Sequence, residues 1–341
     1  MNDFFKYFIR KLGISIITIF GIIVITFFVT RALPGDPIWY RLPSKALMED
    51  YLRERARLGL NKPIIYQFFI YMVNLLSGDW GLSMSVVEDS PVWVVISSYF
   101  TKSIDVMIFS MFSAIGLGIL FGKISARKAH SFRDFFIRTI SYLILSIPGF
   151  VLVVFFIQII LNTPFNILPL YGYKNSLYPN PPRVTNFVII DSLISGQLYL
   201  IPDYLWHLII PVAAMTIVQM VATIRHSRSS ILEVFEMDFI RTAKAKGCSK
   251  RYIMKNHVMK NALPPIVTVS GMGFPLILGG MIAIEVAYNF VGLGYLFRKA
   301  VLLKDYPVFI GIIFIFSVLV IAINFITDLI IGYLDPRIRL K

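Results

Sequence analysis

Cysteine and acidic residues, which often carry chemistry, are scarce in this sequence. Cys248 is the one cysteine among 341 residues, so an internal disulfide is excluded. No metal site is expected, because the four histidines (His130, His207, His226 and His257) lie far apart without ligand spacing. Charged residues make up 15% of the chain, and 19 acids stand against 33 lysines and arginines.

Motifs that would hold a nucleotide or catalyse a reaction are also missing. The nearest approach to a phosphate-binding loop is GLGILFGKIS. There Leu117 stands where the first glycine should be, and Ile124 follows Lys123 where serine or threonine is required. No G-x-S-x-G, H-E-x-x-H or paired-cysteine pattern occurs. We therefore expect that the chain alone is not an enzyme and holds no cofactor.

Apolar residues, in contrast, are abundant. Hydrophobic residues make up 57% of the sequence, and its mean hydropathy is +0.74, which is too apolar for a water-soluble domain. Six segments are long enough to cross a hydrocarbon layer of about 30 Å as helices. The sequence therefore predicts an all-α membrane protein with six transmembrane helices, at residues 11–32, 103–122, 139–162, 204–225, 263–290 and 307–333.

Lysines and arginines are unevenly distributed between the loops. With the N-terminus in the cytoplasm, 19 of them lie in cytoplasmic segments, whereas the short outer loops 163–203 and 291–306 carry 2 and 3. This bias predicts cytoplasmic N and C termini, and it explains the net charge of +14 without a nucleic-acid partner. The first apolar run is too long for a cleaved signal peptide, so we expect a retained span.

This topology divides the chain into three parts. Residues 1–32 form a cytoplasmic segment and the first span, residues 33–102 a long outer loop, and residues 103–341 a five-span core with the cytoplasmic loop 226–262. In the outer loop, KALMEDYLRERARLGL has the composition of a charged helix. PIIYQFFIYMVNLL is apolar but too short to span, so it is expected to lie along the membrane surface or to pack on the bundle.

The segment RTAKAKGCSKRYIMKNHVMKNALPP, residues 241–265, carries seven lysines and arginines and no acid. Acids early and bases late favour one helix over residues 231–246. Gly247 supplies the left-handed residue that ends it, and Ser249 is placed to cap a second helix that runs until Pro264. A helix, a sharp turn and a second helix would form a compact projection that can dock in a groove on another protein. The alternative is a basic loop that only orients the chain at anionic headgroups.

The same segment resembles the cytoplasmic signature of permease subunits in binding-protein-dependent ABC importers. That signature is E-A-A, three residues, glycine, nine residues, then I-x-L-P. Gly247 fills the glycine and Ala243 the second alanine, whereas Arg241 and Thr242 replace the Glu and Ala and residues 257–260 replace I-x-L-P. These departures match the dipeptide and oligopeptide branch, which favours sequences such as RTAKAKG followed by a histidine and NALPP.

Further short matches to that branch occur in the expected order along nearly the whole chain. They are LPGDP at residues 33–37, LGLNKP at 58–63, GDWGLS at 78–83, SIPGF at 146–150, HLIIP at 207–211, IEVAYNFVGLGYL with KDYP at 304–307, and YLDPRIR at 333–339. Val291 departs from the pattern, since the branch usually has proline before G-L-G. The resemblance implies the fold of a type I ABC importer permease, with a coupling helix between spans four and five.

The resemblance also implies partners. A second homologous permease would complete the pathway as a heterodimer, two ABC ATPase subunits would bind ATP and Mg, and an extracytoplasmic solute-binding protein would deliver solute. The chain would lie in the cell membrane of a prokaryote. The ATPase-docking residues implied by the match are Phe239, Ile240, Arg241, Thr242, Ala243, Lys244, Ala245, Lys246, Gly247, Cys248 and Ser249.

The fifth predicted span is rich in small residues and contains a proline, which permits close packing or a bend beside a pore. From it we take Ser270, Met272, Phe274, Pro275, Met281 and Glu285 as candidate pathway residues. Peptide is the expected cargo, with oligosaccharide or nickel as alternatives. A secondary transporter or channel is the alternative of another class, and its ion relay would use the acids near the span ends, Asp105, Glu285 and Asp328.

Overall fold

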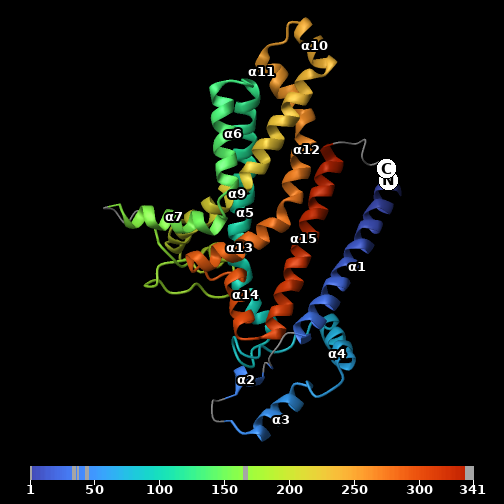
Figure 1. Ribbon diagram of the computed structural model, residues 1–341, viewed down its shortest axis with the longest axis vertical. Helices are drawn as coiled ribbons and strands as arrows, with labels where there is room; N and C mark the ends of the chain where they lie inside the picture. Colours follow the sequence, from blue (N-terminus) through green and yellow to red (C-terminus); the bar gives the residue numbers. More distant parts are fainter. Residues whose placement is uncertain (1, 33–35, 37, 43–45, 164–167, 335–341) are drawn as a thin grey trace.

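The computed structural model describes residues 2–32, 36, 38–42, 46–163 and 168–334. Within these ranges the chain is helical, and the one β bridge joins Leu82 to Pro91. The longest helices run along the long axis of the molecule (Figure 1), as expected for an all-α bundle. Two matched motifs lie largely outside the described residues: of residues 33–37 only Asp36 is described, and nothing beyond Leu334 is.

Among the described residues, four helices can cross a membrane without a break. They are α1 (Asn2–Ala32), α5 (Val92–Arg127), α9 (Leu200–Glu236) and α15 (Tyr306–Leu334). Each contains one predicted span, but α5 and α9 are 36 and 37 residues long and extend beyond the predicted bounds. Hydropathy marks only the apolar part of a helix, whereas the backbone hydrogen bonds continue through the polar ends. The protein is a multi-pass membrane protein.

The predicted third span is divided between two helices. These are α6 (Phe132–Leu145) and α7 (Gly149–Leu161), whose axes differ by 102°. Pro148 stands at the bend. A proline lacks the N–H that would continue the helix, and it disfavours helical geometry in the residue before it. In Figure 1, α7 accordingly projects sideways from the bundle, nearly at right angles to α6.

The predicted fifth span is divided in the same way. α12 (Met259–Met272) ends at Gly273, and α13 (Phe274–Tyr288) follows at a bend of 53°. The described chain therefore has six spans only if each bent pair counts as one. Both bends turn an apolar helix away from the long axis of the molecule, and α7 and α13 contact each other at mid-height (Figure 1).

Three shorter helices lie toward the lower end of the molecule in Figure 1, namely α2 (Ile38–Arg41), α3 (Met48–Arg57) and α4 (Ile64–Leu76). Two others are α8 (Val188–Ile194) and α14 (Leu293–Leu302). α4 is the apolar segment expected on the membrane surface or against the bundle. Its Phe68 ring lies 5.3 Å from the ring of Phe27 on α1, and Phe27 is buried. The helix therefore packs on the bundle.

The two longest helices, α5 and α9, approach each other very closely. A Cβ added to Gly118 would lie 2.5 Å from the Thr223 Cβ, and one added to Gly122 would lie 2.5 Å from the Ser227 Cβ and 2.9 Å from the Ile224 carbonyl oxygen. Such approach through small residues is how membrane helices gain packing energy, because lipid supplies no hydrophobic force between them. The glycines therefore fix the position of α5 against α9.

This packing predicts that Gly122→Ala lowers the thermal unfolding temperature of the purified protein in detergent. The added methyl overpacks a backbone contact, which costs about 1–3 kcal/mol. Gly116→Ala is the matched control on the same helix, since its Cβ meets nothing within 4 Å and alanine is the better helix former. Equal unfolding temperatures for the two variants would show that α5 does not touch α9 at Gly122.

Candidate functional site

A short helix, α10 (Asp238–Ala245), stands at the extreme upper end of the molecule in Figure 1. It lies within the segment predicted to dock. The chain leaves it through Gly247, whose φ of +76° is left-handed, as predicted. The N–H of Cys248 donates to the Ala243 carbonyl at 3.1 Å, and the N–H of Gly247 donates to the Lys244 carbonyl at 3.0 Å. This pair of bonds is a Schellman closure, which ends a helix tightly.

The second helix of the predicted pair starts as expected but ends elsewhere. The Ser249 Oγ accepts the N–H of Tyr252 at 3.3 Å, which confirms the predicted cap. The prediction that this helix ends before Pro264 is wrong. α11 (Lys250–Tyr252) continues through the π-helix η1 (Ile253–Val258) into α12, which contains both Pro264 and Pro265. Apolar residues of η1 and α12 are buried in the same cluster, so the packed face continues across the junction between them.

The predicted single helix over residues 231–246 is also wrong. α9 ends at Glu236, Met237 is extended (φ −70°, ψ 145°), and α10 begins afresh. Ile231 and Ile240 are nine residues apart, which is about two and a half turns of an α-helix. In one continuous helix they would therefore face opposite sides. The break at Met237 turns the chain so that both are fully buried in one apolar cluster.

We call this cluster the apolar base of α10. Its members come from α5, α9, α10, η1 and α12, five elements that meet beneath the short helix. They are Ala126, Ile231, Val234, Ile240, Ala243, Ile253, Met254, Val258, Ala262 and Ile266. Burial of each larger aliphatic side chain contributes about 1.5–3 kcal/mol. α10 is therefore seated on the spans rather than attached by a loose linker.

The structure divides the predicted docking residues into two groups. Ile240 and Ala243 face the apolar base, so they hold the helix rather than offer a contact to another protein. Cys248 is half-buried. The others are exposed: Phe239, Arg241, Thr242, Lys244, Ala245, Lys246, Gly247 and Ser249. The exposed surface of α10 and its turn thus combines one aromatic ring with cations.

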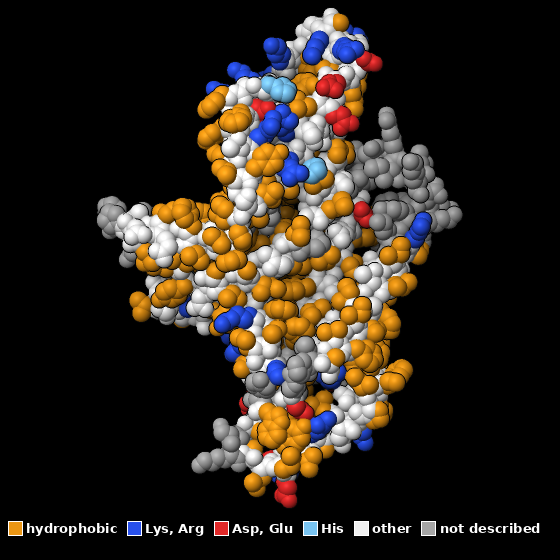
Figure 2. Space-filling model, viewed as in Figure 1, with side chains coloured by type: hydrophobic (Ala, Val, Ile, Leu, Met, Phe, Trp, Pro, Cys, Tyr) orange, Lys and Arg blue, Asp and Glu red, His pale blue; other side chains and the backbone are white. Residues whose placement is uncertain are grey.

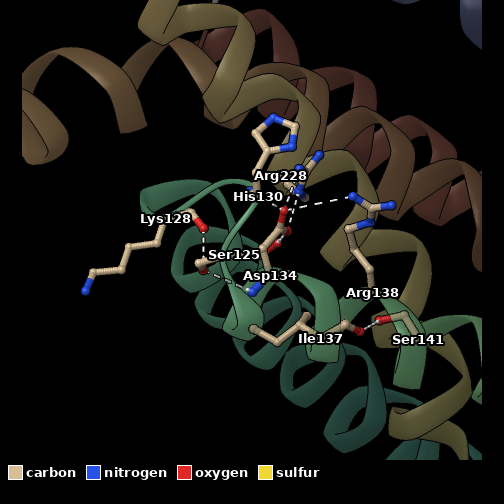
Figure 3. Close-up of polar contacts among 9 residues, drawn as sticks. Ser125, Lys128, His130, Asp134, Ile137, Arg138, Ser141 and Arg228 are labelled. Carbon is tan, nitrogen blue, oxygen red and sulfur yellow. Dashed lines mark hydrogen bonds and ion pairs between the residues drawn. The ribbon is translucent and has the colours of Figure 1, made fainter.

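A buried ion pair links the helices below α10 (Figure 3). The Asp134 carboxylate is fully buried near the start of α6, and the Arg228 guanidinium of α9 donates to both its oxygens, at 2.7 and 2.8 Å. The Ser125 hydroxyl of α5 and the His130 N–H also donate to it. Such bidentate, charge-assisted bonds are strong and directional. They tie the α5–α6 hairpin to α9.

Sequence reasoning missed this pair. One signal was available, because Asp134 is the sole acid among the basic residues 123–138. A single acid within a basic cytoplasmic segment indicates that its carboxylate pairs with a specific cation. Nothing in the sequence distinguishes Arg228 from the other arginines of the loop after the fourth span.

A cavity of about 250 Å³ lies in the middle of the described bundle, between α5, α7, α9, α12 and α13. Its walls are mainly apolar, and its polar lining residues are Gln219, Thr223, Arg225 and Ser270. Ser270 was a predicted pathway residue. Gln219 and Arg225 were missed, although they are the only amide and the only cation in the predicted span 204–225.

The other predicted pathway residues lie away from this cavity or are not described. Met272 is 70% exposed on α12, whereas Met281 is fully buried in the core. The side chains of Phe274 and Pro275 lie outside the described part of the chain. Glu285 is fully buried, and its carboxylate accepts the Ser103 hydroxyl at 2.5 Å and the Gly294 N–H at 2.7 Å. It thereby caps the start of α14, where an anion complements the helix dipole.

Comparisons with known proteins identify the family of the chain. Residues 114–340 match the family described as binding-protein-dependent transport system inner membrane component, and residues 4–110 match the family of its N-terminal part. The chain is 32% identical over 335 residues to the di/tripeptide transport system permease protein DppB of Pseudomonas aeruginosa, with 97% of each chain covered. It is 33% identical over 335 residues to the dipeptide transport system permease protein DppB of Alkalihalophilus pseudofirmus, with 98% of this chain and 99% of the relative covered.

A solved structure shares the fold. The MetNI methionine ABC transporter, in an inward-facing conformation, has a chain that superimposes with a TM-score of 0.50 at 16% identity, over 69% of this chain and 93% of that one. With the family match over two thirds of the sequence and relatives aligned over nearly all of it, the chain belongs to the binding-protein-dependent transport system inner membrane components.

Proposed function

We propose that the protein is the membrane-spanning permease subunit of an ATP-driven ABC importer and forms half of a translocation pathway for peptides. The observation that carries the proposal is α10, a short helix closed by Gly247, seated on an apolar base and exposing Phe239 among cations. Peptide cargo is supported by the two relatives, whose names specify dipeptide and di/tripeptide transport.

The proposal includes the partners that this architecture requires. Two ABC ATPase subunits bind ATP and Mg and grip α10, because the sequence has no nucleotide-binding motif. A second, homologous permease completes the pathway, and an extracytoplasmic solute-binding protein delivers the peptide. The bias of lysines and arginines supports a cytoplasmic position for α10 and for the N and C termini, and the bacterial relatives support a prokaryotic cell membrane.

Force passes from α10 into the spans through two kinds of contact. The apolar base couples α10 directly to α9, η1 and α12. The ion pair between Asp134 and Arg228 then couples α9 to the α5–α6 hairpin. When ATP binding draws the ATPases together, α10 moves with them and these helices rotate as a rigid body, which opens the pathway outward.

The cavity of about 250 Å³ is the part of the pathway that this chain supplies. Its apolar walls accept varied side chains, and the Gln219 amide and the Ser270 hydroxyl can hydrogen-bond to a peptide backbone. Arg225 carries the one charge among its lining residues and can attract a carboxylate. Of the pathway residues predicted from the sequence, we retain Ser270, and we add Gln219 and Arg225.

Gly247→Val is expected to uncouple ATP hydrolysis from uptake. A β-branched residue strains the left-handed backbone by about 1–2 kcal/mol, so α10 loses its fixed closure while the spans stay inserted. In vesicles that contain the complete importer, hydrolysis should persist while dipeptide uptake per ATP falls severalfold. The Gly247→Asn variant should recover much of the dipeptide uptake per ATP, since asparagine tolerates the left-handed conformation.

The matched control is Gly196→Val. Gly196 also has a left-handed φ, +70°, with open space around it, but lies at the opposite end of α9. The Gly196→Val variant bears the same backbone strain without touching α10. Peptide uptake should therefore stay coupled to ATP hydrolysis in this variant. Unimpaired uptake by Gly247→Val, with the subunit present in normal amount, would count against docking through this loop.

Asp134→Asn tests the ion pair. It leaves the Arg228 guanidinium without a buried counter-charge, which is expected to cost about 3 kcal/mol of unfolding free energy. Arg138→Gln is the control, because Arg138 lies 3.9 Å from Asp134 and 45% of its side chain is exposed, so its loss should cost less than about 1 kcal/mol. Denaturant unfolding of the purified protein measures both, and similar losses would refute the role given to the pair.

A further inference from the structure

A large cavity lies at the foot of α10, separate from the one in the middle of the bundle. Its volume is about 1120 Å³. Seven of its lining residues are cations and none is an acid. The cations come from the end of α5, from α10, from α11 and from η1: Lys123, Arg127, Lys128, Lys244, Lys250, Arg251 and Lys255.

These seven charges are not neutralised within the described part of the chain, where none of them forms a salt bridge. The nearby acids are otherwise engaged or turned away: Asp134 is held by Arg228, Asp238 pairs with Arg241, and Glu233 and Glu236 are exposed outside the cavity. Like charges gathered in a concave site focus a positive potential. The site therefore favours a multivalent anion.

The floor of the cavity is apolar. Ile253 and Met254 are 3% exposed, and Phe235 and Met259 pack beside them. A purely polar anion gains nothing from such a floor. A phosphate that carries an apolar group would place its charge among the lysines and arginines and its apolar part on these side chains.

The position of the cavity indicates where such an anion comes from. Lys123, Arg127 and Lys128 lie on the last turns of α5 or directly after it, just beyond the apolar segment 103–122 that is predicted to cross the membrane. Figure 2 shows hydrophobic side chains over the middle of the molecule and lysines and arginines gathered at the α10 end. In the proposed orientation this end meets the cytoplasmic leaflet, where basic pockets between spans bind anionic headgroups.

We infer that this cavity is a binding site for the phosphate headgroup of an anionic phospholipid, and we expect the two phosphates of cardiolipin to bind more tightly than a single phosphate because seven cations line the site. Lys244 and Cys248 belong both to its wall and to the predicted docking segment, so a bound lipid touches the coupling loop directly. The inference concerns lipid binding and stands whether or not peptide is the cargo.

The test uses the protein purified with the subunits that accompany it, stripped of lipid in neutral detergent. Cardiolipin, phosphatidylcholine and inorganic pyrophosphate are titrated separately, and bound molecules are counted by native mass spectrometry. The pocket variant Lys123→Gln/Arg127→Gln/Lys128→Gln is compared with Arg10→Gln/Arg133→Gln/Lys260→Gln, which removes as many cations outside the cavity.

Cardiolipin should bind the unaltered protein and the control alike, and it should bind the pocket variant on the order of a hundredfold more weakly, because each cation beside an anionic headgroup contributes about a fivefold factor. Phosphatidylcholine should show no such difference.

Equal loss of cardiolipin in both triple variants would overturn the site, because the effect would then be one of overall charge. A second contrary result is that pyrophosphate displaces cardiolipin and itself binds the pocket variant more weakly than the unaltered protein. The cavity would then bind a free phosphate rather than a lipid headgroup. Loss of the ATPase subunits from the pocket variant alone would also overturn the inference, since the cations would then contact protein.

Discussion

The burial of Ile240 and Ala243 on the apolar base is the contact on which the α10 end of the molecule depends. An eight-residue helix has too few internal hydrogen bonds to be stable alone in water. α10 (Asp238–Ala245) therefore owes its existence to what lies beneath it. That base joins α5, α9, η1 and α12. The conformation of α10 and the packing of these helices therefore depend on each other.

Two buried acids, Asp134 and Glu285, add polar contacts to the apolar packing between the helices. The Asp134 carboxylate is fully buried and receives bonds from α9, from α5 and from the backbone before α6. A charge withdrawn from water to this degree needs all of them, since an unpaired ion costs several kcal/mol. Glu285 follows the same rule at the other end of the bundle, where Ser103 and the first N–H groups of α14 surround it. Both acids connect segments far apart in the sequence.

Local chemistry was predictable wherever neighbouring residues decide the conformation. Gly247 adopts the left-handed backbone that a β-branched residue enters only with strain, and Ser249 caps the helix that follows it. The extent of α9 was not predictable in this way. Residues 231–246 have consistent helix propensity, and only the requirement that Ile231 and Ile240 share one cluster breaks the helix at Met237. That cluster contains residues from α5 and η1, which sequence order places elsewhere.

The sequence by itself determined the class of the protein, because long apolar runs must become helices in a membrane. It also contained the family motifs that imply a permease. The tertiary structure alone decided the pairing of Asp134 with Arg228 and the meeting of seven cations at one cavity. Each of these depends on distances between residues remote along the chain, and such distances exist only once the helices have packed.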